Sequence, residues 1–218
     1  MSIFDVMGPI MIGPSSSHTA GAARLGRLAR CIAGGDVKKA ILNLHGSFAT
    51  TRQGHGTDRA LLGGLMGFSP DDRRIRTAFQ EAEERGLSWE FREVSLSGVH
   101  PNTVLFQLGD RGDIEIRGSS IGGGEVMVDR IDNYEVEITG RYDTLWVVHE
   151  DRPGMVGNIT SALGSHEINI ASMSNMRREK KGIASSVIEL DQPLTDDIFD
   201  HLAAMAGIEF VRLIPALN

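Results

Sequence analysis

The sequence predicts an α+β fold in two parts: a glycine-rich first part over residues 1–142, and a smaller part over residues 143–218 with the ferredoxin-like order βαββαβ. Helix-like spacing of apolar residues is most frequent in the first third of the chain, and strand-like alternation follows it. After residue 142, helix and strand patterns alternate regularly. Hydrophobic residues make up 41% of the chain, which is enough for a packed core.

Three helices are expected in the first part. The first runs from about residue 19 to residue 32, where apolar residues recur on one face, and the second from residue 57 to about residue 66. The third has the clearest boundaries, with Ser69 as its N-cap, Pro70 in its first turn and Gly86 after its end. The same part holds a mostly antiparallel sheet, whose strands are expected at 39–44, 89–94, 103–108, 113–117, 125–131 and 134–138.

The second part follows a regular order. A short apolar strand at 145–149 leads into the turn Asp151-Arg152-Pro153-Gly154, which opens a helix. Strands are expected at 169–176 and 184–190, a second helix starts at Thr195, and a last strand covers 208–214. This order is the βαββαβ motif.

Composition and charge exclude several classes of protein. The formal net charge is -7, so the chain has no general attraction for nucleic acid or anionic lipid. No apolar run approaches the ~18 residues that a membrane span needs. The start, Met1 to Asp5, lacks the basic and apolar regions of a signal peptide. We therefore expect a cytoplasmic protein that binds neither nucleic acid nor membrane.

Cysteine and lysine are scarce. Cys31 is the one cysteine, so the chain forms no internal disulfide and no cysteine cluster for a metal. The lysines form two adjacent pairs, Lys38-Lys39 and Lys180-Lys181, which is typical of solvated turns. A pyridoxal-phosphate enzyme needs a sheltered Schiff-base lysine instead. If the chain takes part in amino-acid chemistry, we expect its electrophile to come from elsewhere.

The segment Gly13-Pro14-Ser15-Ser16-Ser17-His18-Thr19 stands just before the first predicted helix. Its hydroxyls and free backbone N–H groups lie at a positive helix end, which suits a carboxylate or a phosphate. Serine and threonine are also ordinary N-caps, so capping alone explains part of this pattern. The histidine favours a functional role, because capping does not require it.

A second histidine lies in the segment Gly54-His55-Gly56-Thr57-Asp58. Flanking glycines allow a ligand or other backbone to approach closely, and histidine can act as a general base near neutral pH. The alternative is a flexible loop in which His55 is exposed and Thr57 or Asp58 caps the next helix. The functional interpretation requires the two histidine segments to converge in space.

Two further segments, His100-Pro101-Asn102 and Gly118-Ser119-Ser120-Ile121-Gly122-Gly123-Gly124, are candidates of lower weight. The glycine run has backbone N–H groups that suit a carboxylate, but it is no P-loop because no Gly-Lys-Ser/Thr follows. Turns are the more frequent explanation of both segments.

In the second part, His149 and Asp151 bracket the end of a strand, and Asn169 precedes the next one. We expect one edge of the sheet to gather all three. With the backbone N–H groups around Gly154, they suit the ammonium and carboxylate groups of a small amino acid. Turn chemistry, with Asp151 as an N-cap and Asn169 in a loop, is the alternative.

Together, the four segments of the first part resemble the β subunit of bacterial iron–sulfur L-serine dehydratase, over residues 1 to about 140. The resemblance implies an allosteric-substrate-binding-like fold there and an ACT domain from about Thr144. His149 to Gly154 and Ile168 to Ile170 are similar to the serine-binding positions of the phosphoglycerate dehydrogenase ACT domain. Asp151 stands where that domain has asparagine; its charge opposes a ligand carboxylate and favours an ammonium group or a monovalent cation.

The resemblance further implies a separate α subunit whose cysteines hold a [4Fe-4S] cluster, and a homodimer formed through the ACT domain. The implied reaction converts L-serine to pyruvate and ammonia. As a hypothesis, His55 is the base that removes the α-proton, and His18 with Ser15, Ser16 and Ser17 orients the substrate or assists proton transfer. The implied substrate-binding residues are Thr19, Gly56, Thr57, Asp58, His100, Asn102, Ser120, Gly122 and Gly123.

The competing interpretation is an amino-acid-sensing regulatory module without a catalytic role, like the effector-binding tail of a phosphoglycerate dehydrogenase. Such a tail is fused to a nucleotide-binding domain with a Gly-x-Gly-x-x-Gly fingerprint. This sequence contains no such fingerprint, and a sensor has no need of the two histidine segments.

Overall fold

The computed structural model describes residues 10–109, 113–177 and 182–217. The predictions made for Met1 to Asp5 and for Lys180-Lys181 therefore concern residues outside this description. Contacts divide the chain into two compact units, the first ending at Asp132 and the second starting at Asn133. The domain boundary expected after residue 142 stays a prediction.

The helices of the first unit follow the predicted order, with a difference at the start. A π-helical turn, Ser16–Gly21, leads into α1 (Ala22–Ala33). Single π-turns are rare and occur frequently at functional sites. Two short helices, α2 (Ser47–Thr50) and α3 (Arg52–His55), then precede α4 (Thr57–Leu65).

The prediction for the third helix was wrong at its N-terminus. Ser69 is not the N-cap; its hydroxyl donates to Asp71 Oδ1 instead. The cap is Asp72, whose carboxylate accepts from the Arg74 N–H and pairs with the Arg74 guanidinium. A 3-10 helix, Arg73–Thr77, follows, and α5 is confined to Ala78–Glu84. The ion pair with Arg74 adds to the hydrogen bond from the Arg74 N–H, which explains why Asp72 rather than Ser69 is the cap.

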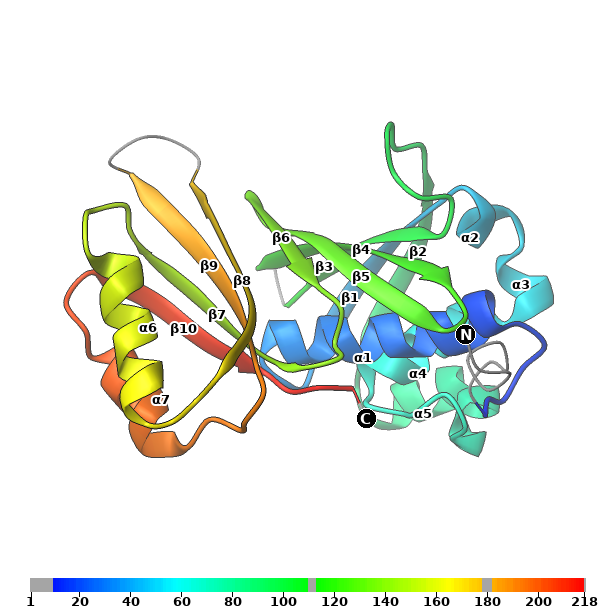
Figure 1. The fold of residues 1–218 in the computed structure, drawn as a ribbon. Coiled ribbons are helices and arrows are strands. Elements are labelled where there is room, and N and C mark those ends of the chain that lie inside the picture. Colours follow the sequence, from blue (N-terminus) through cyan, green and yellow to red (C-terminus); the bar gives the residue numbers. More distant parts are fainter. Residues whose placement is uncertain (1–9, 110–112, 178–181, 218) are drawn as a thin grey trace. The chain divides into compact units, whose positions relative to one another are not determined.

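The larger sheet has the strand order β2-β1-β3-β4-β5-β6. As predicted, most of its pairs are antiparallel, and only β1 with β2 is parallel among the pairs described. Helices α1, α4 and α5 lie on one face of this sheet (Figure 1). Its strands are β1 (Lys39–His45), β2 (Ser88–Val94), β3 (Thr103–Leu108), β4 (Ile114–Gly122), β5 (Glu125–Ile131) and β6 (Tyr134–Ile138).

Helices α1 and α4 cross at glycines. A Cβ atom on Gly26 would stand 2.3 Å from the Leu61 carbonyl oxygen, and one on Gly64 would stand 2.2 Å from the Ala23 carbonyl oxygen. Real side chains essentially never come so close, so the two backbones touch directly. This close crossing sets where the residues before α1 and α4 lie, and both histidine segments are there.

The run from Gly118 to Gly124 is mostly strand. Strand β4 continues through Ser119 and Ser120 to Gly122, which pairs with Glu125 of β5. Gly123 and Gly124 have positive φ angles and form the turn between the two strands. The expectation that β4 ends at residue 117 was therefore wrong, because cross-strand pairing extends it.

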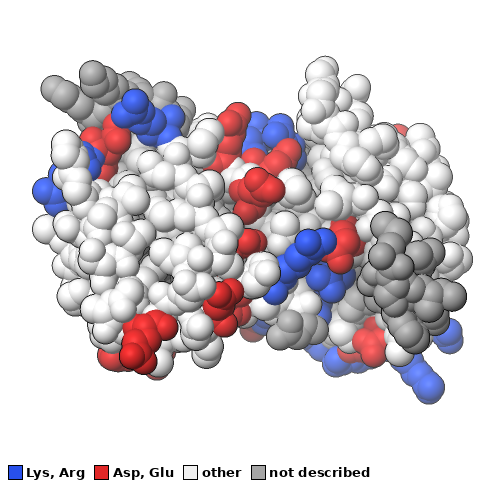
Figure 2. Space-filling view, viewed as in Figure 1, with Lys and Arg blue, Asp and Glu red and all other residues white. Residues whose placement is uncertain are grey.

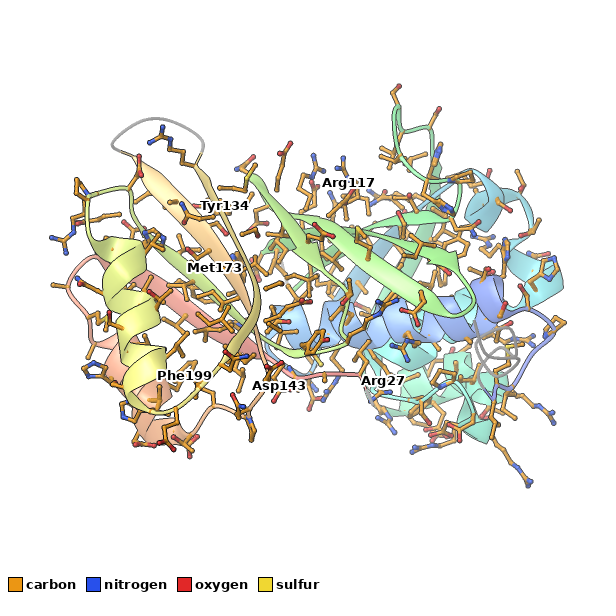
Figure 3. The ribbon with its side chains drawn as sticks, in the orientation of Figure 1. Arg27, Arg117, Tyr134, Asp143, Met173 and Phe199 are labelled. Atoms are coloured by element: carbon orange, nitrogen blue, oxygen red, sulfur yellow. The ribbon has the colours of Figure 1, made fainter. Side chains whose placement is uncertain are left out.

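The second unit has the predicted order βαββαβ in β7 (Asp143–Glu150), α6 (Met155–Ser165), β8 (Ile170–Arg177), β9 (Ile183–Leu190), α7 (Asp196–Ala203) and β10 (Ile208–Ile214). Its sheet has the order β10-β7-β9-β8, and both helices lie on one face (Figure 1). Met173 of β8, labelled in Figure 3, packs against the apolar core between the sheet and the helices. That core includes Leu145, Val147, Ile159, Leu163, Ile188, Ile198 and Leu202.

The second unit has two acidic residues at the start of its second helix. Asp196 and Asp197 stand in the first turn of α7, where they complement the positive helix end. Figure 2 shows acidic side chains gathered at this end of the unit, at the lower left. No helix in the described part of the chain is long and apolar enough to cross a membrane.

Candidate functional site

His18 lies in the π-helical turn and is held from two sides. Its backbone N–H donates to Ser15 Oγ at 3.1 Å, so Ser15 caps the turn. Its ring nitrogen Nδ1 stands 3.4 Å from Ser15 Oγ, and Nε2 stands 3.0 Å from Ser47 Oγ. Ser16 and Ser17 belong to the same turn and are half-buried. Capping, the alternative explanation of this segment, therefore accounts for Ser15, and a functional role of His18 stays a prediction.

The two predicted histidine segments meet. The rings of His18 and His55 have their centroids 5.0 Å apart. Thr19 ties the two segments together, because its buried hydroxyl donates to the His55 carbonyl oxygen at 3.1 Å. Gly56 has a φ of 67°, the left-handed conformation that suits glycine, and this turn directs the chain from His55 into α4. Two segments 36 residues apart thus form one site.

The surroundings of His18 favour the neutral form of its imidazole. Burial lowers the pKa of its imidazole, since burial penalises the charged form, and the neighbouring His55 lowers it further. A neutral imidazole can accept a proton. The Nδ1 atom of His55 is buried and has no hydrogen-bond partner among the described residues. Proton-accepting groups are therefore concentrated at this point of the fold.

A cavity of about 240 Å³ opens beside His55. Ile12, Gly13, Thr19 and Gly54 contribute to its wall. Two arginines, Arg59 and Arg76, also line it, and none of the described lining residues is acidic. The cavity therefore favours a small ligand that carries a negative group.

Ser47 was missed by the sequence analysis. It is the first residue of α2, and Gly46, with a φ of 56° and ψ of -123°, separates it from the end of β1. Phe48, the next residue, contacts the His18 ring edge-on at 5.4 Å between centroids. A glycine-serine pair directly after a buried strand was the available signal, but nothing local in the sequence connects it to His18.

The predicted residues His100, Asn102 and Ser120 form a third group, which meets the histidine-bearing turn at Ser120. Asn102 accepts from the Ser120 N–H at 3.0 Å with its carbonyl, and its side chain reaches the Ser120 carbonyl oxygen at 3.5 Å. The Ser120 hydroxyl is buried without a partner among the described residues and packs on Gly21 of the π-turn. His100 is exposed, and its Nδ1 accepts from the Asn102 N–H.

Other predicted residues have different positions. Thr57 is fully buried at the start of α4, and its hydroxyl has no partner among the described residues. Asp58 is buried too, and its carboxylate accepts from the Arg59 N–H. Gly122 ends β4, and Gly123 lies in the turn between β4 and β5. All four residues were predicted to bind substrate, and that assignment stays a prediction.

In the second unit, His149 is only 2% exposed. Its Nδ1 stands 2.9 Å from the Glu150 carbonyl oxygen, and its Nε2 lies 3.0 Å from Ser186 Oγ and 3.1 Å from Asn175 Oδ1. The ring therefore forms part of a buried polar network in this chain. Asp151 is half-buried and pairs with Arg177 at 3.2 Å, and Gly154 precedes α6 with a φ of 90°.

The expectation that one sheet edge gathers His149, Asp151 and Asn169 was wrong within a single chain. Strands β7 and β8 both run antiparallel to β9, so they run parallel to each other. The end of β7, with His149, and the start of β8, with Asn169, therefore lie at opposite ends of the sheet. Asn169 hydrogen-bonds to Asp191 and Gln192 there.

The side chains that could bind a metal are not clustered in the part of the chain that the structure describes. Across the described ranges, no group of three or more His, Cys, Asp and Glu side chains is arranged to hold a metal ion. Cys31 is partly buried, and burial raises the pKa of its thiol. With a single cysteine, the chain cannot supply the four thiolates of an iron–sulfur cluster.

Comparison with known proteins gives a consistent result. Residues 2–88 match the family described as serine dehydratase beta chain. The chain is 42% identical over 208 residues to the probable L-serine dehydratase, beta chain, of Bacillus subtilis, covering 95% of this chain and 94% of that protein. It is 40% identical over 211 residues to the L-serine dehydratase, beta chain, of Peptoniphilus asaccharolyticus, with the same coverage.

A second group of relatives differs in length. A D-3-phosphoglycerate dehydrogenase of Synechocystis is 30% identical over 189 residues, which cover 86% of this chain. The match spans only 34% of that dehydrogenase. Similarity to this protein is thus restricted to a minor portion of it, whereas similarity to the beta chains extends over nearly their whole length.

Proposed function

This chain belongs to the family of L-serine dehydratase β chains, and on that basis we propose that it is the β subunit of an enzyme converting L-serine to pyruvate and ammonia. The observation that carries this proposal is the convergence of His18 and His55, 5.0 Å apart, beside a cavity lined by two arginines. A carbon–nitrogen lyase of this type needs a proton acceptor next to a site for a small carboxylate. These residues provide both.

The electrophile belongs to a second polypeptide in this proposal. A cysteine-bearing α subunit holds a [4Fe-4S] cluster, which fits a β chain with a single cysteine of raised thiol pKa. When bound, the cluster supplies a Lewis-acidic iron that polarises the substrate's carboxylate and hydroxyl, making hydroxide a better leaving group. Every remaining role falls to protein side chains.

His55 is the base that removes the α-proton of serine. Its buried Nδ1 has no partner among the described residues, so no described protein group competes for that nitrogen. The Thr19 hydroxyl holds the His55 backbone and so keeps the imidazole next to the cavity. A well-placed base of this kind contributes roughly 10²–10⁴-fold to the rate.

His18 and the serines before it orient the substrate and help to move the proton. The lowered pKa favours the neutral form of His18, and a neutral imidazole can accept a proton during turnover. Its two ring nitrogens already face the hydroxyls of Ser15 and Ser47. Loss of the α-proton and of hydroxide leaves aminoacrylate, which tautomerises and hydrolyses to pyruvate and ammonia.

The test is His55→Ala in a complex reconstituted with the cysteine-bearing α subunit under anaerobic conditions. We expect pyruvate formation from L-serine to fall at least about 10²-fold, because the base is removed, while the absorbance of the cluster is retained. His201→Ala is the matched control: His201 is exposed on α7, so this variant should turn over normally. Wild-type turnover by His55→Ala would exclude His55 as the base.

The second unit is proposed to pair with a copy of itself and to bind a small effector. Strand β8 is an edge of the four-stranded sheet, and most of its residues are exposed, so it can pair with another strand. The effector is an amino acid such as serine, or a monovalent cation near Asp151. Sedimentation of the full chain distinguishes a dimer from a monomer.

A regulatory module without catalytic role is the second candidate, favoured by the match to a phosphoglycerate dehydrogenase over 86% of this chain. The two proposals predict different results when the protein is purified and assayed with L-serine. A β subunit co-purifies with a brown, cysteine-rich chain and releases pyruvate from L-serine. A colourless homodimer that binds serine without turnover would favour the sensor.

A further inference from the structure

We propose that Ser47 is a positioning residue that fixes the ring orientation and the tautomer of His18. The contact between Ser47 and His18 does not depend on the proposed function. Only the effect on turnover rests on that function. Ser47 lies outside both histidine segments, and no pattern in the sequence connects it to them.

The contact from Ser47 is the stronger of the two that hold the His18 ring. Nε2 stands 3.0 Å from Ser47 Oγ, within the normal range of hydrogen bonds, whereas Nδ1 stands 3.4 Å from Ser15 Oγ, near the outer limit. Ser15 Oγ also accepts the His18 backbone N–H. The Ser15 hydroxyl is thus shared, whereas among the described residues the Ser47 hydroxyl has the His18 ring as its one partner.

Ser47 is itself held rigidly. Its backbone N–H donates to the Pro101 carbonyl oxygen at 2.9 Å. Its carbonyl oxygen accepts from the N–H of Thr51 at 3.0 Å and from the Thr51 hydroxyl at 2.7 Å. A residue anchored at both its amide and its carbonyl presents its hydroxyl in a defined direction.

Gly46 makes this placement possible. Its φ of 56° with ψ of -123° is open to glycine, and a Cβ atom there would lie 2.6 Å from the Pro101 carbonyl oxygen. The backbone at residues 46 and 47 therefore packs directly on the loop that contains Pro101. Through Ser47, this loop supports His18.

Phe48 completes the support. Its ring meets the His18 ring edge-on at 5.4 Å, so consecutive residues of α2 hold the imidazole by a hydrogen bond and by packing. A neutral imidazole carries its proton on one nitrogen or the other, and the hydrogen bond at the opposite nitrogen decides which. A serine hydroxyl can donate or accept, so the contact with Ser47 fits either tautomer by itself. Ser15 Oγ already accepts the His18 backbone N–H, and its own proton is then free to point to Nδ1. In this proposal Nε2 therefore carries the ring proton and donates it to Ser47 Oγ, and proton transfer by His18 requires that tautomer.

The first test measures the tautomer in the full chain. Long-range ¹H–¹⁵N correlation of the imidazole rings gives the two nitrogen shifts of His18, assigned by their loss in His18→Gln. In the wild type we expect well-separated shifts, the pattern of one neutral tautomer. In Ser47→Ala the separation should shrink as both tautomers become populated. Unchanged shifts in Ser47→Ala would overturn the inference.

Matched variants separate positioning from general damage. Thr160→Ala removes an exposed hydroxyl that bonds to carbonyl oxygens of its own helix, α6, so it should leave the His18 shifts unchanged. Ser47→Thr keeps a hydroxyl and should restore the wild-type separation. Ser47→Cys keeps the volume with a weaker hydrogen-bonding group and should give an intermediate result; melting temperatures confirm that each variant is folded.

The second test measures turnover in the reconstituted enzyme. Loss of one neutral hydrogen bond predicts a fall in kcat of about three- to tenfold for Ser47→Ala, with recovery in Ser47→Thr. Altered shifts with unaltered kcat would leave the positioning role intact and refute the proposed role of His18. Unaltered shifts would refute the positioning role whatever the activity, so the two failures are distinguishable.

Discussion

Gly21 packs directly against Ser120: a Cβ atom on residue 21 would stand 2.0 Å from the Ser120 hydroxyl oxygen and 2.9 Å from its Cβ atom. Gly21 ends the π-helical turn that carries His18, and Ser120 lies in β4. The absence of a side chain at residue 21 therefore lets the histidine-bearing turn rest on the sheet.

Gly21→Ala should destabilise the protein by about 1–3 kcal/mol, because rotation of the Ser120 hydroxyl relieves the first contact but not the second. The turn must then shift, so turnover of the reconstituted enzyme should fall as well. Urea unfolding measures the first effect and pyruvate formation the second.

Two double variants check the cause of that loss. Gly21→Ala with Ser120→Ala keeps the Cβ contact and should remain destabilised, whereas Gly21→Ala with Ser120→Gly removes it and should recover part of the loss. Equal stability of Gly21→Ala and wild type would contradict the packing described.

From the close crossing of α1 and α4 we expect a larger loss of stability in Gly64→Ala than in Gly21→Ala. In Gly64→Ala the added carbon would meet only backbone, with the Ala23 carbonyl oxygen at 2.2 Å and the Arg27 nitrogen at 2.8 Å. Backbone in two packed helices cannot move aside, so we expect at least the upper end of the about 1–3 kcal/mol typical of overpacking.

Gly157→Ala is the matched control for this loss. Gly157 lies in α6 with nothing within 4 Å of an added Cβ atom, so the same change should stabilise by about 0.5–1 kcal/mol through helix propensity. The two variants should differ in sign in urea unfolding. A neutral Gly64→Ala would disprove the close crossing.

Stability should depend on the titration of His18. Burial and the neighbouring His55 lower the pKa of His18 below its ordinary value of 6.5. In the window below 6.5 and above the folded pKa, the unfolded chain binds more protons than the folded one, so the free energy of unfolding rises with pH. The contribution is complete above 6.5 and is lost as the pH falls through the folded pKa.

Urea unfolding of the full chain from about pH 8 down to about pH 5 measures this dependence. His18→Gln should flatten the part of the slope that lies just below pH 6.5, because no titratable group remains at residue 18. An identical slope in the variant would show that His18 is not the group responsible.

The carboxylate of Asp151 leads to a prediction about the charge of the proposed effector. If its carboxylate opposes a ligand carboxylate, Asp151→Asn should increase the rise in melting temperature that L-serine produces, because a ligand stabilises the folded state to which it binds. A potassium-dependent rise that is present in the wild type and lost in Asp151→Asn would point to a cation instead. Absence of any shift with either would refute an effector site at Asp151.

Local patterns predicted most of the fold because each pattern depends on near neighbours. Apolar spacing located α1, α4, α6 and α7, and alternation located the strands. The errors fell where distant residues compete with local preference. Asp72 capped a 3-10 helix with the help of Arg74, and pairing with β5 drew Ser119 and Ser120 into β4.

The candidate site shows the same limit. Ser15, His18 and His55 were found from their segments, because histidines among glycines and serines are unusual. Ser47 was not, because its role depends on a 3.0 Å contact with a residue 29 positions away. Asn169 was misplaced because the parallel course of β7 and β8 follows from the pairing of both with β9.

The sequence alone therefore determined the α+β class, the βαββαβ order, the poverty in cysteine and the two histidine segments, since all of these are properties of short stretches or of composition. Only the tertiary structure decided that His18 and His55 meet, that Ser47 holds His18 and that His149 and Asn169 stand apart within a chain. Such relationships depend on the direct contact of α1 with α4 and on strand order. Both arise from packing between residues far apart in sequence, which no local pattern encodes.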